Sequence, residues 1–144
     1  SLFFDGQDIT PFLKDYTVDQ SVAVVSPVVA VRDKVVEAQR VFADKHDSVI
    51  EGRDSGSVVF PHADYKFYIT APLTVRALRW KQDQTQRGNQ FTLEQAEAQI
   101  SERDRKDLER DYCPLTIPKG AFEIDTSHLS KEQVVEKIMT FIKN

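Results

Sequence analysis

The sequence contains the stretch Glu51-Gly-Arg-Asp-Ser-Gly-Ser-Val-Val-Phe-Pro61, which directly follows the short apolar run Ser48-Val49-Ile50. The apolar run predicts a buried strand that ends at Glu51, and in open α/β sheets ligands bind at the carboxyl ends of strands. The two glycines let the backbone approach a ligand closely, and the guanidinium of Arg53 suits a phosphate. A polar turn with a local Arg53–Asp54 pair explains the same residues, so both interpretations stay open.

Strands and helices are predicted to alternate on the carboxyl side of this turn. Two capping boxes, Thr92-x-x-Gln95 and Ser130-x-x-Gln133, mark helix starts. We expect strands over 66–70 and 122–125, and helices over 72–81, over 92–112 and after residue 130. Strands that alternate with helices indicate an α/β fold with a parallel sheet.

The first 43 residues are less clearly patterned. Residues 2–6 predict a strand that runs into an Asp-Gly turn, and a loop is expected over 8–11 because Pro11 disfavours helix at the residue before it. Residues 22–25 are mostly β-branched and could form a strand. Apolar residues spaced by three and four predict a helix over 28–43.

The composition is that of an ordinary globular domain. The 144 residues are 40% hydrophobic and 29% charged, with a net charge of −4 and a mean hydropathy of −0.43. These values exclude a disordered chain and a strongly basic nucleic-acid-binding surface, and no apolar run is long enough to span a membrane. With Cys113 as the single cysteine, we expect a cytoplasmic protein without disulfides. No metal site is recognisable, and Glu51 is the one candidate for an indirect metal contact.

A second charged cluster lies on the helix predicted over 92–112. At about 100° per residue, Asp107 lies about 40° from Arg103, and Arg110 lies about 20° to the other side. These three residues therefore share one narrow face, which would offer two guanidiniums and a carboxylate to an anionic, hydroxyl-bearing ligand. A solvated helix with i,i+4 ion pairs accounts for the same pattern.

A third cationic group lies on the helix predicted over 72–81. Arg76 and Arg79 are three residues apart on one face, and Lys81 leads into a polar loop that contains Arg87. This arrangement is typical of a mobile lid that closes over phosphates. Ordinary surface charge is the alternative interpretation.

Three stretches together resemble bacterial cytidylate kinases, which belong to the nucleoside monophosphate kinase group of P-loop proteins. They are residues 51–61, residues 100–110 followed by Pro114-Leu115, and residues 124–130. The resemblance covers nearly the whole chain. It implies a P-loop NTPase-like parallel sheet with flanking helices, and transfer of a phosphoryl group from ATP, with Mg²⁺, to CMP or dCMP to give CDP or dCDP.

The resemblance also implies roles for individual residues. It assigns cytosine recognition to Arg32 and Asp54, the acceptor phosphate to Arg53 and Arg110, and the ribose surroundings to Arg103 and Asp107. It assigns the transferred phosphoryl group to Arg76 and Arg79 of the lid, with Arg53 beside it.

Three positions depart from the family pattern. Ala23 stands where a serine is usual, so that Ser21 or Ser26 would have to replace this contact. Trp80 replaces a lid arginine that is common in the family. Glu51 stands where an aspartate is frequent.

The phosphate-binding motif Gly-x-x-x-x-Gly-Lys-Ser/Thr does not occur in the 144 residues. We therefore expect the C-terminal portion of a longer enzyme, lacking the P-loop strand and helix, which would be marginally stable alone or paired with a P-loop segment or partner chain. The expected organisation is part of the monophosphate-binding insert over 1–47, core strands and a helix over 48–81, a lid loop over 82–91 and the remaining core over 92–144. Alone, such a portion would be inactive. A catalytically inactive nucleotide-binding fragment and a protein-interaction fragment are the alternatives.

Overall fold

The computed structural model describes residues 1–13 and 16–143, without the side chains of residues 16, 19, 20 and 23. The chain divides into two compact units, Ser1–Ser48 and Val49–Asn144. Each unit is described by itself. Within the described residues, no helix combines the length and the apolar character that a membrane crossing requires.

The N-terminal unit begins with a β-hairpin. Strand β1 (Phe3–Phe4) pairs antiparallel with β2 (Gln7–Asp8) around Asp5 and Gly6, which both have positive φ angles, 48° and 80°. The predicted strand and Asp-Gly turn are therefore confirmed. The loop expected over 8–11 is wrong in detail, because Asp8 pairs in β2 and a 3₁₀ helix, η1 (Thr10–Phe12), follows.

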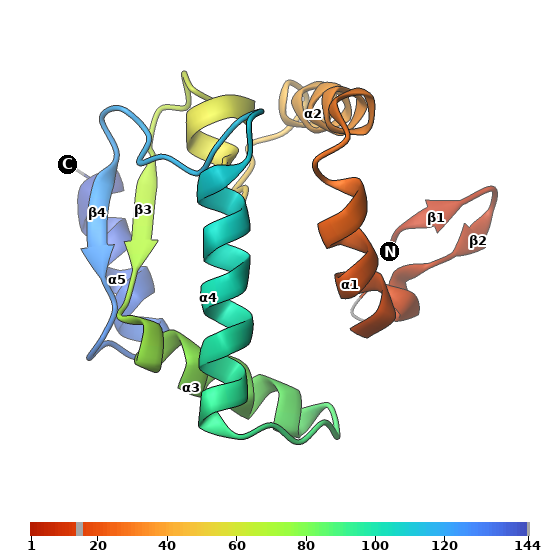
Figure 1. The fold of residues 1–144 in the computed structure, drawn as a ribbon. Helices are drawn as coiled ribbons and strands as arrows, with labels where there is room; N and C mark the ends of the chain where they lie inside the picture. Colours follow the sequence, from red (N-terminus) through yellow and green to blue (C-terminus); the bar gives the residue numbers. More distant parts are fainter. Residues whose placement is uncertain (14–15, 144) are drawn as a thin grey trace. The chain divides into compact units, whose positions relative to one another are not determined.

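Two helices complete the N-terminal unit, α1 (Tyr16–Val25) and α2 (Val29–Ala43) (Figure 1). The strand interpretation of residues 22–25 is wrong: the segment is helical, since β-branching lowers helix propensity only slightly. The helix predicted over 28–43 is confirmed, but its predicted apolar stripe is exposed: Val31, Val35 and Phe42 are 40–58% accessible. Within the described residues, the side of α2 that is turned away from solvent instead carries Val36 and Ala43.

The C-terminal unit contains a parallel pair of strands, β3 (Phe67–Thr70) and β4 (Phe122–Asp125), in which Ile69 lies opposite Ile124. The helices of this unit are α3 (Leu73–Gln86), α4 (Leu93–Glu109) and α5 (Lys131–Ile142). The predicted mixed α/β class with a parallel sheet is confirmed.

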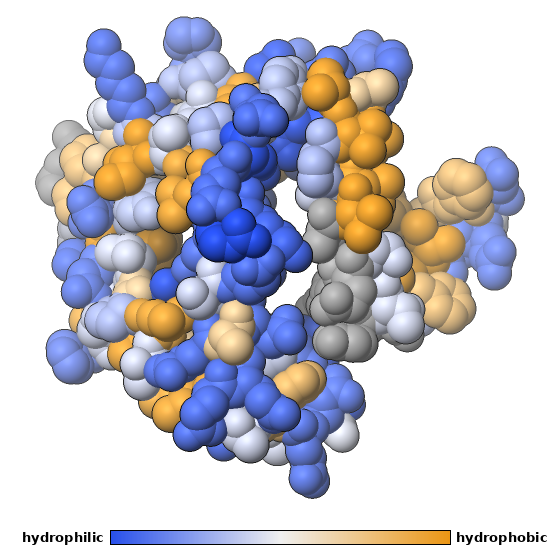
Figure 2. All heavy atoms as spheres, in the orientation of Figure 1, coloured by the Kyte–Doolittle hydropathy of each residue, from blue (hydrophilic) through white to orange (hydrophobic). Residues whose placement is uncertain are grey.

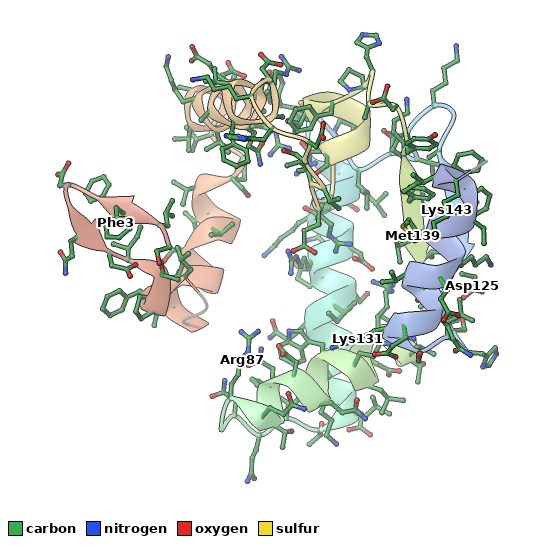
Figure 3. All side chains as sticks on the ribbon, turned by 180° about the vertical axis from the view of Figure 1, so that it is seen from behind. Phe3, Arg87, Asp125, Lys131, Met139 and Lys143 are labelled. Carbon is green, nitrogen blue, oxygen red and sulfur yellow. The ribbon has the colours of Figure 1, made fainter. Side chains whose placement is uncertain are left out.

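Helix α5 covers one face of these strands (Figure 1). Phe141 of α5 lies 4.3 Å from Phe122 and 6.0 Å from Phe67 between ring centroids. Seen from behind, α5 lies in front of the sheet, with Met139 and Lys143 along it and Asp125 where β4 ends (Figure 3). These aromatic contacts form the apolar layer between helix and sheet.

Helices α3 and α4 pack against each other and follow each other directly in the chain. Each contributes a fully buried alanine, Ala77 from α3 and Ala96 from α4. Trp80, which replaces a lid arginine of the resembled family, packs on Phe91 with ring centroids 4.8 Å apart. This position therefore supports the packing of the helix pair.

Both predicted capping boxes are present. Thr92 and Ser130 each accept a hydrogen bond from the backbone N–H three residues later, and the glutamine at that later position accepts one in return. These caps fix where α4 and α5 begin.

The strand predicted over 48–50 is wrong. No strand forms at Ser48-Val49-Ile50, and Val49 is fully exposed. A strand needs a neighbour with which to pair, and among the described residues β3 pairs only with β4. An apolar, β-branched run is therefore insufficient to make a strand here.

Helix α3 continues past residue 81 to Gln86, so that half of the segment expected as a loop over 82–91 is helical. The buried Gln84 terminates this helix: its side-chain oxygen accepts from Asn89 Nδ2 at 2.8 Å, and its backbone oxygen accepts from Asn89 N at 2.9 Å. The segment is polar but rich in glutamine, which favours helix. Polarity alone therefore mispredicted a loop. Helix α4 likewise ends at Glu109, three residues earlier than expected.

Candidate functional site

The turn after residue 50 folds into a single π-helical turn, η2 (Ser55–Val59). The backbone oxygen of Asp54 accepts from Val58 N at 2.9 Å, and Phe60 N donates to Ser55 O at 2.7 Å. Turns of this type occur frequently at functional sites. The loop expected at 53–57 therefore has a defined backbone, which positions the side chains of Arg53 and Asp54.

Helix α4 turns a mixed apolar and acidic stripe away from solvent. Ala96 and Ile100 begin this stripe, and Asp104 and Asp107 continue it at the same three- and four-residue spacing. The backbone of the following segment returns to the helix, because Leu115 N donates to Asp107 O at 2.7 Å. Two carboxylates are therefore held on the packed side of α4, where they meet arginines from other segments.

Six side chains form a connected network, which we call the Asp–Arg cluster. It consists of Arg53 and Asp54 from the turn, Arg76 from α3, and Asp104, Asp107 and Arg110 from α4 and its end. Asp104 accepts from Arg53 Nη2 and from Arg76 Nη1, both at 2.6 Å. Arg53 Nε lies 2.9 Å from Asp107 Oδ2.

Arg110 joins the turn to α4. Its Nη2 lies 3.8 Å from Asp54 Oδ2, its Nη1 lies 3.6 Å from Asp107 Oδ1, and its Nε donates to the backbone oxygen of Cys113. The side chains of Asp54 and Arg110 are only 15% and 14% exposed. Residues 56 positions apart in the sequence thus meet in one partly buried site.

The cluster contains three arginines and three aspartates, so its charges balance. Its side chains are 14–35% exposed, which places the ion pairs between surface pairs and buried ones. A guanidinium has five N–H groups, and the ion pairs of Arg53 engage its Nε and Nη2. The cluster can therefore orient guanidiniums towards an anion that carries several oxygens, such as a phosphate.

Arg79 occupies a different environment from Arg76. Its Nη1 donates to Thr126 Oγ1 at 2.9 Å and its Nη2 to Thr126 O at 2.6 Å, directly after β4. Thr126 Oγ1 in turn donates to Thr70 O at 3.0 Å, where β3 ends. The two proposed lid arginines thus lie on one helix but contact different segments.

The sequence prediction placed Arg103 on the same face as Asp107 and Arg110, but in the structure its side chain does not join the Asp–Arg cluster, so its role near the ribose stays a prediction. Arg103 is exposed, and among the described residues no hydrogen bond or ion pair engages its side chain. Its neighbour in the sequence, Asp104, belongs to the Asp–Arg cluster instead. The continuing stripe from Ala96 and Ile100 was the signal that pointed to Asp104.

The solvent side of α4 carries ion pairs within the helix. Arg105 contacts Glu102 at 2.9 Å and Glu109 at 2.5 Å. The hydrogen bond from Arg105 lowers the pKa of Glu102 to about 2. A hydrophilic band accordingly follows α4 in Figure 2. For this face, the interpretation as a solvated helix holds.

Two predicted positions lie in the N-terminal unit. Arg32 on α2 is half-buried, and its Nη1 donates to Ser26 O at 3.3 Å. The side chain of Ala23 lies outside the described residues. The proposed contribution of Arg32 to cytosine recognition therefore stays a prediction.

No set of three or more His, Cys, Asp or Glu side chains that could hold a metal ion occurs within the described residues. Glu51, the candidate for an indirect contact, is exposed. Arginines supply the positive charge of the Asp–Arg cluster.

A family model described as cytidylate kinase matches residues 1–144. The chain belongs to the cytidylate kinase family. It is 39% identical to a cytidylate kinase of Caldanaerobacter subterraneus subsp. tengcongensis over 142 residues, which are 99% of this chain and 63% of that protein. It is 38% identical to a cytidylate kinase of Thermodesulfovibrio yellowstonii over 138 residues, 96% of this chain and 62% of that protein.

A cytidylate kinase sequence also occurs within a larger relative. The chain is 38% identical over 138 residues to a bifunctional pantoate ligase/cytidylate kinase of a Synechococcus species. It covers 26% of that protein's length. The chain spans somewhat less than two thirds of the length of the first two relatives.

Proposed function

We propose that this chain forms the acceptor-nucleotide site and the lid of an ATP-dependent cytidylate kinase, which transfers the γ-phosphoryl group of ATP to CMP or dCMP. Family membership supports the class of reaction. The single observation that carries the assignment to residues is the ion pair of Arg110 with Asp54, because it joins the turn to the charged helix in one site. ATP, with Mg²⁺, is the phosphoryl donor, and a P-loop segment of the longer protein or a partner chain would bind it.

The acceptor phosphate is proposed to bind Arg53 and Arg110. Both belong to the Asp–Arg cluster, and ion pairs to aspartates fix the orientation of their guanidiniums. Phosphoryl transfer requires mainly positioning and neutralisation of charge, with little covalent chemistry from the protein. The two guanidiniums would position the attacking phosphate oxygen and neutralise its charge.

Cytosine recognition is proposed for Asp54, assisted by Arg32. A carboxylate can accept a hydrogen bond from the exocyclic amine of cytosine, which uracil lacks. A site built around a specific hydrogen bond rejects an analogue without it by up to ~10⁴–10⁵-fold. We therefore expect preference for CMP and dCMP over UMP. Asp107 and Arg103 are proposed to lie near the ribose.

Arg76 and Arg79 on α3 are proposed to act on the transferred phosphoryl group when the lid closes. The contact of Arg76 with Asp104 already places it in the cluster. Arg79 would have to leave Thr126 to reach the same group. We therefore expect Arg79 to contribute late, during closure.

The binding proposal is tested by titrating CMP, dCMP, UMP and AMP into the chain, with Asp54→Ala and Arg110→Ala as variants. CMP is expected to bind, AMP to bind at least tenfold more weakly, and each variant to weaken CMP binding at least tenfold. Glu109→Gln, which removes only an exposed pair with Arg105 on α4, is the matched control and is expected to bind normally. Binding that is unchanged in Arg110→Ala would remove this residue from the phosphate site.

The catalytic proposal is tested with the longest natural form of the protein that carries this chain. ADP formation is measured with ATP, Mg²⁺ and each monophosphate. Equal rates with AMP and CMP contradict the assignment. Binding of CMP without transfer would instead favour a nucleotide-binding role, and indifference to all nucleotides would favour protein interaction.

A further inference from the structure

Asp104 connects three segments of the C-terminal unit. It lies on α4, and its two oxygens contact different arginines: Oδ1 lies 2.6 Å from Arg53 Nη2, and Oδ2 lies 2.6 Å from Arg76 Nη1. Arg53 belongs to the turn before η2, and Arg76 belongs to α3. A single carboxylate therefore joins an arginine proposed for the acceptor phosphate to one proposed for the lid.

Each of these arginines has a second contact, which is an ion pair for Arg53 and a hydrogen bond for Arg76. Arg53 Nε lies 2.9 Å from Asp107 Oδ2, and Arg76 Nε donates to Ala71 O at 2.9 Å, just after β3. Contacts at two nitrogens restrict the rotation of a planar guanidinium about its stem. Asp104 thus supplies the shared contact that sets the spacing between the two arginines.

On the basis of the function proposed above, we propose that Asp104 is a positioning residue, which holds Arg53 and Arg76 so that both reach one phosphoryl group during transfer. Arg53 Nη2 and Arg76 Nη1 contact the two different oxygens of the Asp104 carboxylate, which is smaller than a phosphoryl group. The guanidinium fork matches carboxylates and phosphates alike. Two arginines bridged by Asp104 are therefore spaced to share a phosphoryl group as well.

The chemistry of the bridge requires a carboxylate. An ionised aspartate offers acceptor oxygens on both sides, whereas asparagine has one acceptor oxygen and an NH₂ donor. In Asp104→Asn, one guanidinium would face another donor and lose its position, while the shape of the side chain stays nearly the same. The substitution therefore removes the bridge and leaves the packing of α4 in place.

The test is a double-mutant cycle in the longest natural form of the protein, with Asp104→Asn, Arg76→Met and the double variant. Asp104→Asn is expected to lower kcat with CMP about 10–100-fold, since misplacement by about 1 Å can cost 10²-fold, and to raise the KM for CMP less than tenfold. In the Arg76→Met background, the same substitution is expected to change kcat less than threefold, because the partner of the bridge is already absent. Glu109→Gln is the control and is expected to leave both constants unchanged.

An unchanged kcat in Asp104→Asn, or equal fold losses in the two backgrounds, would overturn the positioning role. If Asp104→Asn does not fold, Asp104→Ser, which also lacks the carboxylate, replaces it in the same cycle: a lowered kcat that is largely absent in the Arg76→Met background supports the role, and an unchanged kcat overturns it. Failure of the wild-type protein to phosphorylate CMP rejects the proposed function itself. Wild-type activity with an indifferent Asp104→Asn rejects only the positioning role.

Discussion

Gly56 lies in η2, where the turn approaches the segment between α4 and β4. A Cβ atom at this position would lie 3.0 Å from Pro118 Cγ and 3.3 Å from Pro118 Cβ. The proline ring cannot rotate away as the end of a flexible side chain would. The glycine is therefore required by close approach, and through this contact the position of the turn depends on the loop after α4.

Gly56→Ala is expected to destabilise the protein by about 1–3 kcal/mol, the usual cost of overpacking. The free energy of unfolding from urea denaturation measures this effect. Pro118→Ala removes the ring. In the Pro118→Ala background, Gly56→Ala should therefore lower the free energy of unfolding much less than it does in the wild type. An equal loss in both backgrounds would show that the ring is not the cause.

Individual site residues differ in how far the sequence predicted them. Arg53, Asp54 and Arg110 were chosen for their chemistry and their motif, and the structure brings them together. Asp104 was missed because helical geometry was counted from Arg103, whose side chain is exposed. The face of a helix that packs is set by its apolar neighbours, here Ala96 and Ile100, and the charged pattern alone does not reveal it.

Helix α4 carries two of the three aspartates of the cluster, so its start and rotation control the site. The hydroxyl of Thr92 accepts from Gln95 N at 3.2 Å, and Gln95 Oε1 accepts from Thr92 N at 2.8 Å. This reciprocal cap satisfies two N–H groups that the first turn otherwise leaves unpaired.

Thr92→Ala removes the side-chain acceptor and is expected to lower the free energy of unfolding by about 0.5–2 kcal/mol. Thr92→Ser keeps the hydroxyl and serves as the matched control, with a loss below about 0.5 kcal/mol, because serine caps as well as threonine. The midpoint of urea unfolding measures both variants. Equal midpoints for Thr92→Ala and Thr92→Ser would contradict a stabilising cap.

Most elements with clear local signals were predicted correctly, including the strands expected over 66–70 and 122–125, whereas two features that depend on distant residues were not. The capping boxes and the helix over 28–43 depend on neighbouring residues, and both are confirmed. The strand expected at 48–50 depends on another strand, and the inward face of α2 depends on what packs against it. Pairing and packing are properties of distant residues, which a local pattern does not contain.

At the scale of the whole chain, the boundary between the two units falls between Ser48 and Val49. The residues from 47 to 52 form no regular secondary structure, and the side chain of Val49 is completely exposed. A protease requires an accessible backbone that is free to adopt an extended form. The boundary offers such a segment directly before the turn that contributes Arg53 and Asp54.

Limited proteolysis with elastase, which cuts after small apolar residues, is expected to cleave first at Val49 or Ile50. Mass spectrometry of early products should show fragments that correspond to the two units. Val49→Pro is expected to slow this cut. Val24→Pro cannot serve as a control for the substitution by proline, because it would break α1. A first cut within α3 or α4 would contradict the boundary.

The sequence by itself determined the family, the α/β class, the starts of α4 and α5 and the residue types proposed for the acceptor site, because motifs and caps are local patterns. Only the tertiary structure decided which charged face of α4 packs, that Asp104 bridges Arg53 and Arg76, and that the run at 48–50 is not a strand. These features depend on distances between segments that are far apart in the chain. An ion pair or a strand pairing forms only when folding brings both partners within a few ångströms.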